Sequence, residues 1–123
     1  MSEQELPPWL REQLARLNQL QQNLQAILMQ KQQLEIESVE IDKAIEELKK
    51  VGVDDAVYKS AGPVLIKGKR DDLLKELEEK KELLSTRIMV LSKQENRLKE
   101  NLKDVQSRID EMIRGQSTGA RAE

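Results

Sequence analysis

Cysteine and histidine are absent from the sequence, and aromatic residues are scarce. Without cysteine the chain has no disulfides and no thiol chemistry, so a reducing compartment is permitted. Without histidine it has neither the commonest metal ligand nor the commonest general base. The aromatic residues comprise one Trp, one Tyr and no Phe. This scarcity disfavours a globular core that is anchored by aromatic side chains.

Long apolar runs are absent as well. No stretch approaches the ~20 consecutive apolar residues that a membrane-spanning helix needs. The N-terminal segment Met1–Glu5 is acidic and does not follow the pattern of a secretory signal peptide. We therefore expect a soluble, cytoplasmic protein without membrane contact.

What the chain has instead is the composition of a long helix. Ala, Glu, Lys, Leu and Arg make up about half of the 123 residues, a proportion typical of coiled coils. Charged residues account for 36% of the chain, yet the formal net charge is only −2. Because the two signs are interspersed, the charges fit a solvated helical face better than a nucleic-acid groove.

A first helix is predicted over residues 7–50, with Pro8 in its first turn and Gly52 as its stop. Aliphatic residues recur in this segment at heptad positions, in two interleaved series. The first series is Leu20, Ile27, Leu34, Ile41 and Leu48, and the second is Leu10, Leu17, Leu24, Lys31, Ser38 and Ile45. Glutamine is dense between these residues, and a glutamine-rich tract is also compatible with disorder. The regular leucines favour the helix.

A second helix is predicted over residues 71–114, with Asp71 or Asp72 as its cap and Gly115 as its stop. Its two heptad series are Leu77, Leu84, Leu91, Leu98, Val105 and Met112, and Leu74, Lys81, Ile88, Glu95, Leu102 and Ile109. Residues 115–123 are expected to form a disordered tail.

The heptad series of the two helices match if the helices run antiparallel. From Leu48 opposite Leu74 to Leu10 opposite Met112, each core position faces another core position. This agreement predicts a long antiparallel two-helix coiled coil within one chain, as a single domain over residues 1–123. The seam also contains polar residues, namely Lys31, Ser38, Lys81 and Glu95. We interpret them as side chains that reach solvent and help to set the register.

Between the helices, residues 53–68 are predicted to form one small β-hairpin. Its residues combine β-branched and aromatic side chains with a predicted turn over Ser60-Ala61-Gly62-Pro63. The residues that carry this prediction are Val57, Tyr58, Gly62, Val64, Leu65 and Ile66. An isolated two-stranded hairpin is marginally stable in water, and its unpaired edges favour pairing with another chain. We therefore predict that the hairpin is the element through which subunits assemble.

No pattern in the sequence indicates catalysis, so we predict that the protein is not an enzyme and uses no cofactor or metal. Two helices cannot build the walled cleft that a paired-carboxylate site needs. Gly62 and Gly68-Lys69 resemble a phosphate-binding loop, but the spacing is one residue too long and Arg70 replaces the Ser or Thr that binds magnesium. Basic residues surround the hairpin, where Tyr58 is the one aromatic residue for base stacking. We expect a solvated rim or a subunit contact there, and no nucleic acid.

The free ends of the two predicted helices are rich in apolar residues. The candidate binding residues at these ends are Leu6, Trp9, Leu10, Leu14, Leu17, Ile109, Met112 and Ile113. A two-helix seam covers only a narrow stripe of each helix, so it cannot bury all of these side chains. One interpretation is a locally collapsed end or a self-contact. The functional interpretation is an exposed apolar patch that binds a partner.

Several segments, taken together, resemble a known family. These segments are Leu6–Pro8, Gln19–Gln25, Gln30–Leu34, Val57–Lys59 with Gly62, and Val64–Lys67. They are similar to the prefoldin family, in particular to its beta subunits in their archaeal form. The single hairpin agrees with this resemblance, because the alpha subunits of the family carry two.

The resemblance implies a prefoldin-like chaperone subunit. It implies a heterohexamer of two alpha and four beta subunits, whose hairpins assemble into a β-barrel platform. It also implies an ATP-independent holdase that captures unfolded proteins at the coiled-coil tips and delivers them to a group II chaperonin. A structural coiled-coil scaffold without client binding is the alternative, and an RNA-binding helical arm is a third hypothesis.

Overall fold

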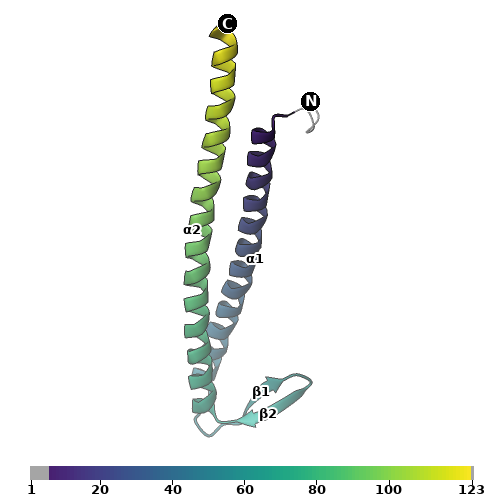
Figure 1. Ribbon diagram of the computed structural model, residues 1–123. Helices are drawn as coiled ribbons and strands as arrows, with labels where there is room; N and C mark the ends of the chain where they lie inside the picture. The colour runs from purple at the N-terminus through teal and green to yellow at the C-terminus, as the bar shows by residue number, and fades with distance from the viewer. Residues whose placement is uncertain (1–5, 123) are drawn as a thin grey trace. The chain divides into compact units, whose positions relative to one another are not determined.

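The computed structural model describes residues 6–122, and the side chains of residues 6–115. In chain order its elements are helix α1 (Pro8–Lys50), strands β1 (Val57–Ala61) and β2 (Val64–Gly68), and helix α2 (Arg70–Ala122) (Figure 1). The predicted fold class, two long helices joined by one small antiparallel hairpin, is confirmed.

The chain divides into two compact units. One unit comprises residues 30–90, which include the hairpin together with the C-terminal part of α1 and the N-terminal part of α2. The other unit comprises residues 1–29 and 91–123, which contain the remaining parts of the two helices. Each unit has a helix–helix seam of its own.

The seam of residues 30–90 is built from the predicted heptad positions. Ile41 and Ile45 of α1 form a buried cluster with Leu84 of α2. The half-buried side chains that pack against this cluster are Leu34, Leu74 and Leu77. The seven-residue period therefore determines which side chains are buried. Burial of these aliphatic groups is the main stabilising contribution in this unit.

Ion pairs connect the two helices beside this seam. The Lys81 Nζ lies 2.5 Å from the Asp42 Oδ1, and the Lys80 Nζ lies 3.3 Å from the Glu37 Oε1. All four side chains are between about two-fifths and three-fifths exposed, so each pair contributes at most about 1 kcal/mol. Lys81 occupies a heptad position, and its ammonium group reaches the rim of the seam as predicted.

In the unit of residues 1–29 and 91–123, the buried aliphatic side chains belong to α2. They are Leu102, Val105 and Ile109, all at predicted heptad positions. Glu95 is also buried, and one of its carboxylate oxygens accepts a hydrogen bond of 2.7 Å from the Lys99 ammonium. An ionised carboxylate is costly to bury, and this charge-assisted bond one turn along the helix offsets part of that cost.

Helix α1 begins as the proline pair predicts. The Pro7 carbonyl accepts hydrogen bonds of 3.1 Å from the backbone N–H groups of both Leu10 and Arg11. Pro8 is the first helical residue, where its missing N–H leaves no donor unsatisfied. Lys49 and Lys50 lie in the last turn, where positive charge favours the negative end of the helix dipole.

Helix α2 begins at Arg70, one residue before the predicted start. The Lys69 carbonyl accepts the first helical hydrogen bond, of 3.0 Å, from the Leu73 N–H. Asp71 and Asp72 therefore lie inside the first turn and do not cap it, and their charges favour the positive end of the helix dipole there.

The end of α2 differs from the prediction. The helix passes through Gly115 and continues to Ala122, where the sequence predicts a stop and then a disordered tail over residues 115–123. A glycine ends a helix when it adopts positive φ, and Gly62 is the glycine with positive φ in the described chain. Inside a helix a glycine costs only about 1 kcal/mol relative to alanine, which is not enough to end it. Glu123 lies outside the described residues.

The central cluster generates a stability prediction. Leu84 is 4% exposed, whereas its neighbour Leu83 is 66% exposed. We expect Leu84→Ala to lower the free energy of unfolding by about 2–4 kcal/mol, because it removes buried carbon atoms and leaves a cavity. Leu83→Ala is the matched control, with an expected change within about 0.5 kcal/mol. Urea unfolding followed by helical circular dichroism measures both, and equal losses would contradict the assigned seam.

Candidate functional site

The hairpin is a regular two-stranded ladder closed by a two-residue turn. β1 and β2 pair antiparallel from Val57 opposite Gly68 to Ala61 opposite Val64. Gly62, the first turn residue, has a φ of 59°. This is the glycine position of a type II′ turn, whose twist matches that of the flanking strands. The turn therefore sets the register, and the register decides which side chains share a face.

The register gives the hairpin two different faces, because directly opposed residues point to the same side of a sheet. Val57 and Lys59 of β1 share one face with Ile66 and Val64 of β2. Val57 is buried, and the Lys59 ammonium pairs with the Glu76 carboxylate of α2, so this face is directed toward the helices of the same unit. The opposite face carries Tyr58 and Ser60 with Lys67 and Leu65.

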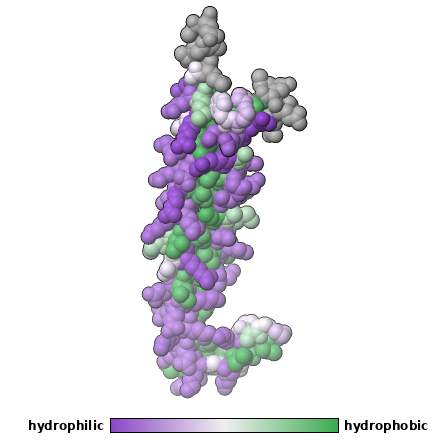
Figure 2. All heavy atoms as spheres, viewed as in Figure 1, coloured by the Kyte–Doolittle hydropathy of each residue, from purple (hydrophilic) through white to green (hydrophobic). Residues whose placement is uncertain are grey.

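Most of the apolar surface of the hairpin is exposed. Of the predicted assembly residues, Val57 is 8% exposed, whereas Leu65 is 71% exposed. The others with more than half of their surface exposed are Tyr58, Val64 and Ile66. Figure 2 shows this apolar surface in green beside the hydrophilic surface of the adjoining helices. In the described chain the sheet has two strands, so each strand has one edge without a partner.

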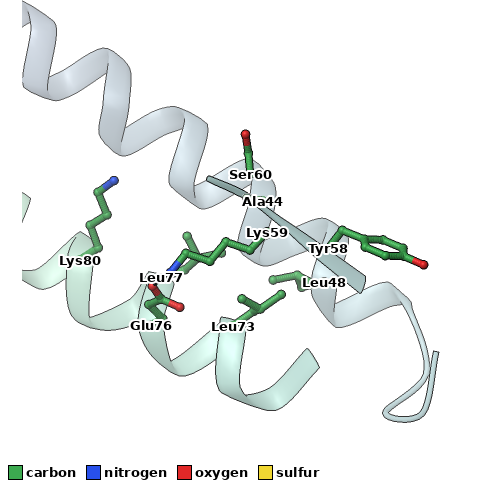
Figure 3. A pocket seen from close by; sticks show the side chains of 9 residues that line it. All are labelled: Ala44, Leu48, Tyr58, Lys59, Ser60, Leu73, Glu76, Leu77 and Lys80. Atoms are coloured by element: carbon green, nitrogen blue, oxygen red, sulfur yellow. Dashed lines mark hydrogen bonds and ion pairs between the residues drawn. The ribbon is translucent and has the colours of Figure 1, made fainter. Parts of the chain in front are cut away.

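A pocket of about 370 Å³ lies between the hairpin and the helices of residues 30–90. Its lining residues are Ala44, Leu48, Tyr58, Lys59, Ser60, Leu73, Glu76, Leu77 and Lys80. Figure 3 shows Lys59 reaching toward Glu76, while the Tyr58 ring points away from the helices. The residues from α1 and α2 supply most of the apolar lining. The sequence does not predict this pocket, although the small Ala44 beside the seam is a signal for open space.

The candidate client-binding residues all belong to the unit of residues 1–29 and 91–123, and their side chains differ in solvent exposure. Leu14, Met112 and Ile113 are exposed. Half-buried side chains from the same set are Leu6, Trp9, Leu10 and Leu17. Ile109 is 8% exposed and belongs to the seam. The surface available to a partner at this end therefore consists mainly of Leu14, Met112 and Ile113, and the binding role of the whole set stays a prediction.

Exposed apolar residues also occur along the helices, away from the predicted sites. In residues 30–90 they include Ile36, Val39, Leu83, Met89 and Val90, and in the other unit Leu28 and Met29. None of them occupies a position in the two predicted heptad series. Apolar residues outside the heptad pattern are therefore the sequence signal that would have identified this exposed surface.

Two further hollows lie along the helix pairs. The first belongs to residues 1–29 and 91–123, and is lined by Asn23, Ala26, Ile27, Gln94, Arg97 and Leu98. The second, in residues 30–90, is lined by Asp42, Ile45, Lys49, Glu78, Lys81, Glu82 and Ser85. Across residues 6–115, no group of three or more Asp, Glu, Cys or His side chains is arranged to hold a metal ion. Within the same range, neither helix contains an apolar stretch of the length that crossing a bilayer requires.

Comparison with known proteins assigns a family to this architecture. The family model described as "Prefoldin subunit" matches residues 11–116. The prefoldin subunit beta of Archaeoglobus fulgidus is 41% identical over 92% of this chain and 97% of its own length. That of Saccharolobus islandicus is 38% identical over 97% of this chain and 98% of its own length.

Solved structures give the same result. The crystal structure of the prefoldin beta subunit from Thermococcus strain KS-1 has a TM-score of 0.81 and 36% identity, covering 90% of this chain and 97% of that one. The prefoldin beta2 subunit from the same strain has a TM-score of 0.67 over 74% of this chain and 97% of that one. At 23% identity, that second likeness shows the fold alone.

The architecture is that of a coiled-coil protein, in which two long helices are joined by an apolar hairpin with an unpaired edge on each strand. A chaperone subunit fits this description. The chain belongs to the prefoldin family, and its archaeal relatives are beta subunits.

The turn of the hairpin generates a prediction about its local stability. Gly62→Ala places a Cβ at positive φ, which costs roughly 1 kcal/mol, although the added atom would meet no other atom within 4 Å. We expect the amides of the β1–β2 ladder to exchange with solvent roughly fivefold faster as a result. Gly62→Asn is the control, because asparagine tolerates this conformation better. Unchanged exchange in Gly62→Ala, measured by NMR, would show that the turn does not limit hairpin opening.

Proposed function

We propose that this chain is one of four beta subunits that assemble with two alpha subunits into a cytoplasmic prefoldin heterohexamer. The hexamer is an ATP-independent holdase: it captures unfolded proteins at the tips of its coiled coils and delivers them to a group II chaperonin. The observation that carries the proposal is the exposed, open-edged hairpin on a chain that belongs to the prefoldin family.

The hairpin supports the assembly part of the proposal. Val64, Leu65 and Ile66 expose more than half of their surface, and covering an aliphatic side chain of this size contributes roughly 1.5–3 kcal/mol. The free edges of β1 and β2 offer backbone donors and acceptors to further strands. Closing several hairpins into a barrel would cover the exposed aliphatic side chains and would pair the free edges, because a closed barrel has no edges.

The exposed residues at the free helix ends support the client-binding part. Unfolded chains expose apolar segments of many different sequences, so their receptor needs adaptable contacts. Met112 has a flexible, polarizable side chain that packs against varied partners, and Leu14 and Ile113 add exposed aliphatic surface. Each contact is weak, but contacts from several arms to one client become intramolecular and raise the avidity by on the order of a hundredfold.

This mode of capture explains independence from ATP. The free energy comes from burying apolar surface of the client, which requires no covalent step.

A scaffold without client binding would use the hairpin in the same way but would have no need of the tip residues. An RNA-binding arm would instead bind with strong salt dependence. An assay for suppression of client aggregation distinguishes the holdase from the scaffold, because only the holdase should suppress it.

The assembly proposal predicts the effect of a charge on β2. Val64→Asp or Ile66→Asp should release subunits from the oligomer that forms with an alpha subunit, because the carboxylate cannot be buried without a partner. Helical circular dichroism should be unchanged, since neither residue contacts the seam cluster. Val53→Asp is the matched control, an exposed valine outside both strands. Light scattering measures the mass, and equal masses for all variants would rule out assembly through β2.

The client-binding proposal predicts the effect of polar substitutions at the tips. A variant combining Leu14→Ser, Met112→Ser and Ile113→Ser should lose most suppression of thermal aggregation of a model client, in buffer without nucleotide. The hexamer should remain assembled, because all three side chains are remote in sequence from the hairpin.

The matched control for this experiment changes exposed residues of the other unit: Leu83→Ser, Met89→Ser and Val90→Ser. It should suppress aggregation as well as the unaltered hexamer does. If the control loses activity and the tip variant keeps it, clients bind along the helices. If both variants keep full activity, the scaffold function is supported instead.

A further inference from the structure

All the sulfur in this chain belongs to methionine, because the sequence has four methionines and no cysteine. Met1 lies outside the described residues. All three methionines that the structure describes, Met29, Met89 and Met112, are exposed. Because no thiolate within the chain competes for an oxidant, these accessible thioethers are its sulfur sites for oxidation.

Met112 differs from the other two methionines in its surroundings. It occupies a predicted heptad position of α2, yet 38% of its surface is exposed, so the seam covers it incompletely. The next residue, Ile113, is exposed as well, whereas Ile109, three residues earlier, is buried. Met112 therefore lies where the buried seam meets the exposed apolar surface at the free helix ends. Met29 and Met89 lie outside both heptad series and outside the candidate client-binding set.

Oxidation by a peroxide changes the chemistry of such a side chain without breaking the chain. The thioether sulfur attacks one oxygen of hydrogen peroxide, so that an S–O bond forms while the O–O bond breaks. The sulfur loses two electrons and becomes a sulfoxide, and the peroxide is reduced to water. The side chain keeps its carbon skeleton but becomes polar. Covering the new oxygen with apolar groups of a client leaves an acceptor without a donor, which is unfavourable.

We propose that Met112 is a reversible modification site: oxidation of its thioether by a peroxide weakens the capture of unfolded proteins, and reduction of the sulfoxide restores it. Oxidation of Met29 and Met89 leaves capture unchanged. The inference rests on the proposed client-binding function of the helix ends, and it adds a chemical means of regulating that function.

The use of several arms makes this response steep. A client that is held by several arms depends on contacts whose affinities multiply, because each further contact is intramolecular. Oxidation of Met112 on only some of the arms then releases a client that the remaining arms hold too weakly. The loss of capture should therefore exceed the fraction of Met112 that is oxidised, most clearly at intermediate doses of peroxide.

Graded peroxide treatment of the hexamer, assembled with an alpha subunit, tests the proposal. Once the hydrogen peroxide has been removed, peptide mass spectrometry measures the sulfoxide at each methionine, and suppression of thermal aggregation of a model client measures capture. With nearly all Met112 oxidised, half-maximal suppression should require roughly fivefold more hexamer, because an acceptor is left unpaired in each contact. Methionine sulfoxide reductases for both sulfoxide epimers should restore the original value.

Two sets of variants identify the responsible sulfur. Met112→Leu keeps a similar volume and a strong helix former but removes the sulfur, so its capture should be normal before peroxide treatment and unchanged after it. The matched control combines Met29→Leu and Met89→Leu, and it should lose capture on oxidation as the unaltered hexamer does. The alpha subunit and the client are the same in every sample, so differences between the samples arise from this chain.

Three results would overturn the proposal. The first is an equal loss of capture on oxidation in Met112→Leu and in the unaltered hexamer. The second is full capture by a hexamer whose Met112 is shown by mass spectrometry to be the sulfoxide. The third is a loss of helical circular dichroism on oxidation of Met112, because capture would then fail through unfolding. A hexamer that does not suppress aggregation before peroxide is added would instead overturn the proposed function itself.

Discussion

A seam between two helices can cover only one stripe of each, and this limit shapes the rest of the molecule. Ile41, Ile45 and Leu84 are buried in that stripe. With so little interior, the fold has no room for the exposed apolar residues of the hairpin or of the helix ends. Such residues would be a liability in a monomer, and in the proposed hexamer they are the surfaces assigned to assembly and to client binding.

The hairpin and the helix ends, to which different recognition roles are proposed, present similar residue types in different ways. At the hairpin, the turn at Gly62 fixes the register, so each side chain has a defined face and a defined neighbour. That order suits a partner of fixed structure. At the helix ends, Met112 and Ile113 lie exposed on a helical surface without a ladder to position a partner. That arrangement suits partners that differ from one encounter to the next.

The sequence was sufficient for the features that depend on local periodicity. The seven-residue repeat identified Ile41, Ile45 and Leu84. The predicted turn contained Gly62 and Pro63 but was two residues too long, because Ser60 and Ala61 continue β1. The sequence was insufficient where a small free-energy difference determines the end of a helix, or where residues far apart in the chain form a site together. Gly115 does not end α2, because one glycine costs too little to stop a helix. The pocket joins Ala44 to Lys80 through the orientation of the hairpin, which no local pattern encodes.

The position of the hairpin in the chain also has a kinetic consequence. Because the chain reverses direction between Lys50 and Arg70, contacts near this reversal close short loops, whereas contacts near Leu17 and Val105 close long ones. Loop-closure entropy rises with length, so helix pairing should nucleate beside the hairpin and proceed outward. The free ends then join last and separate first. The segment proposed to hold unfolded chains is therefore the segment of this protein that most readily unfolds.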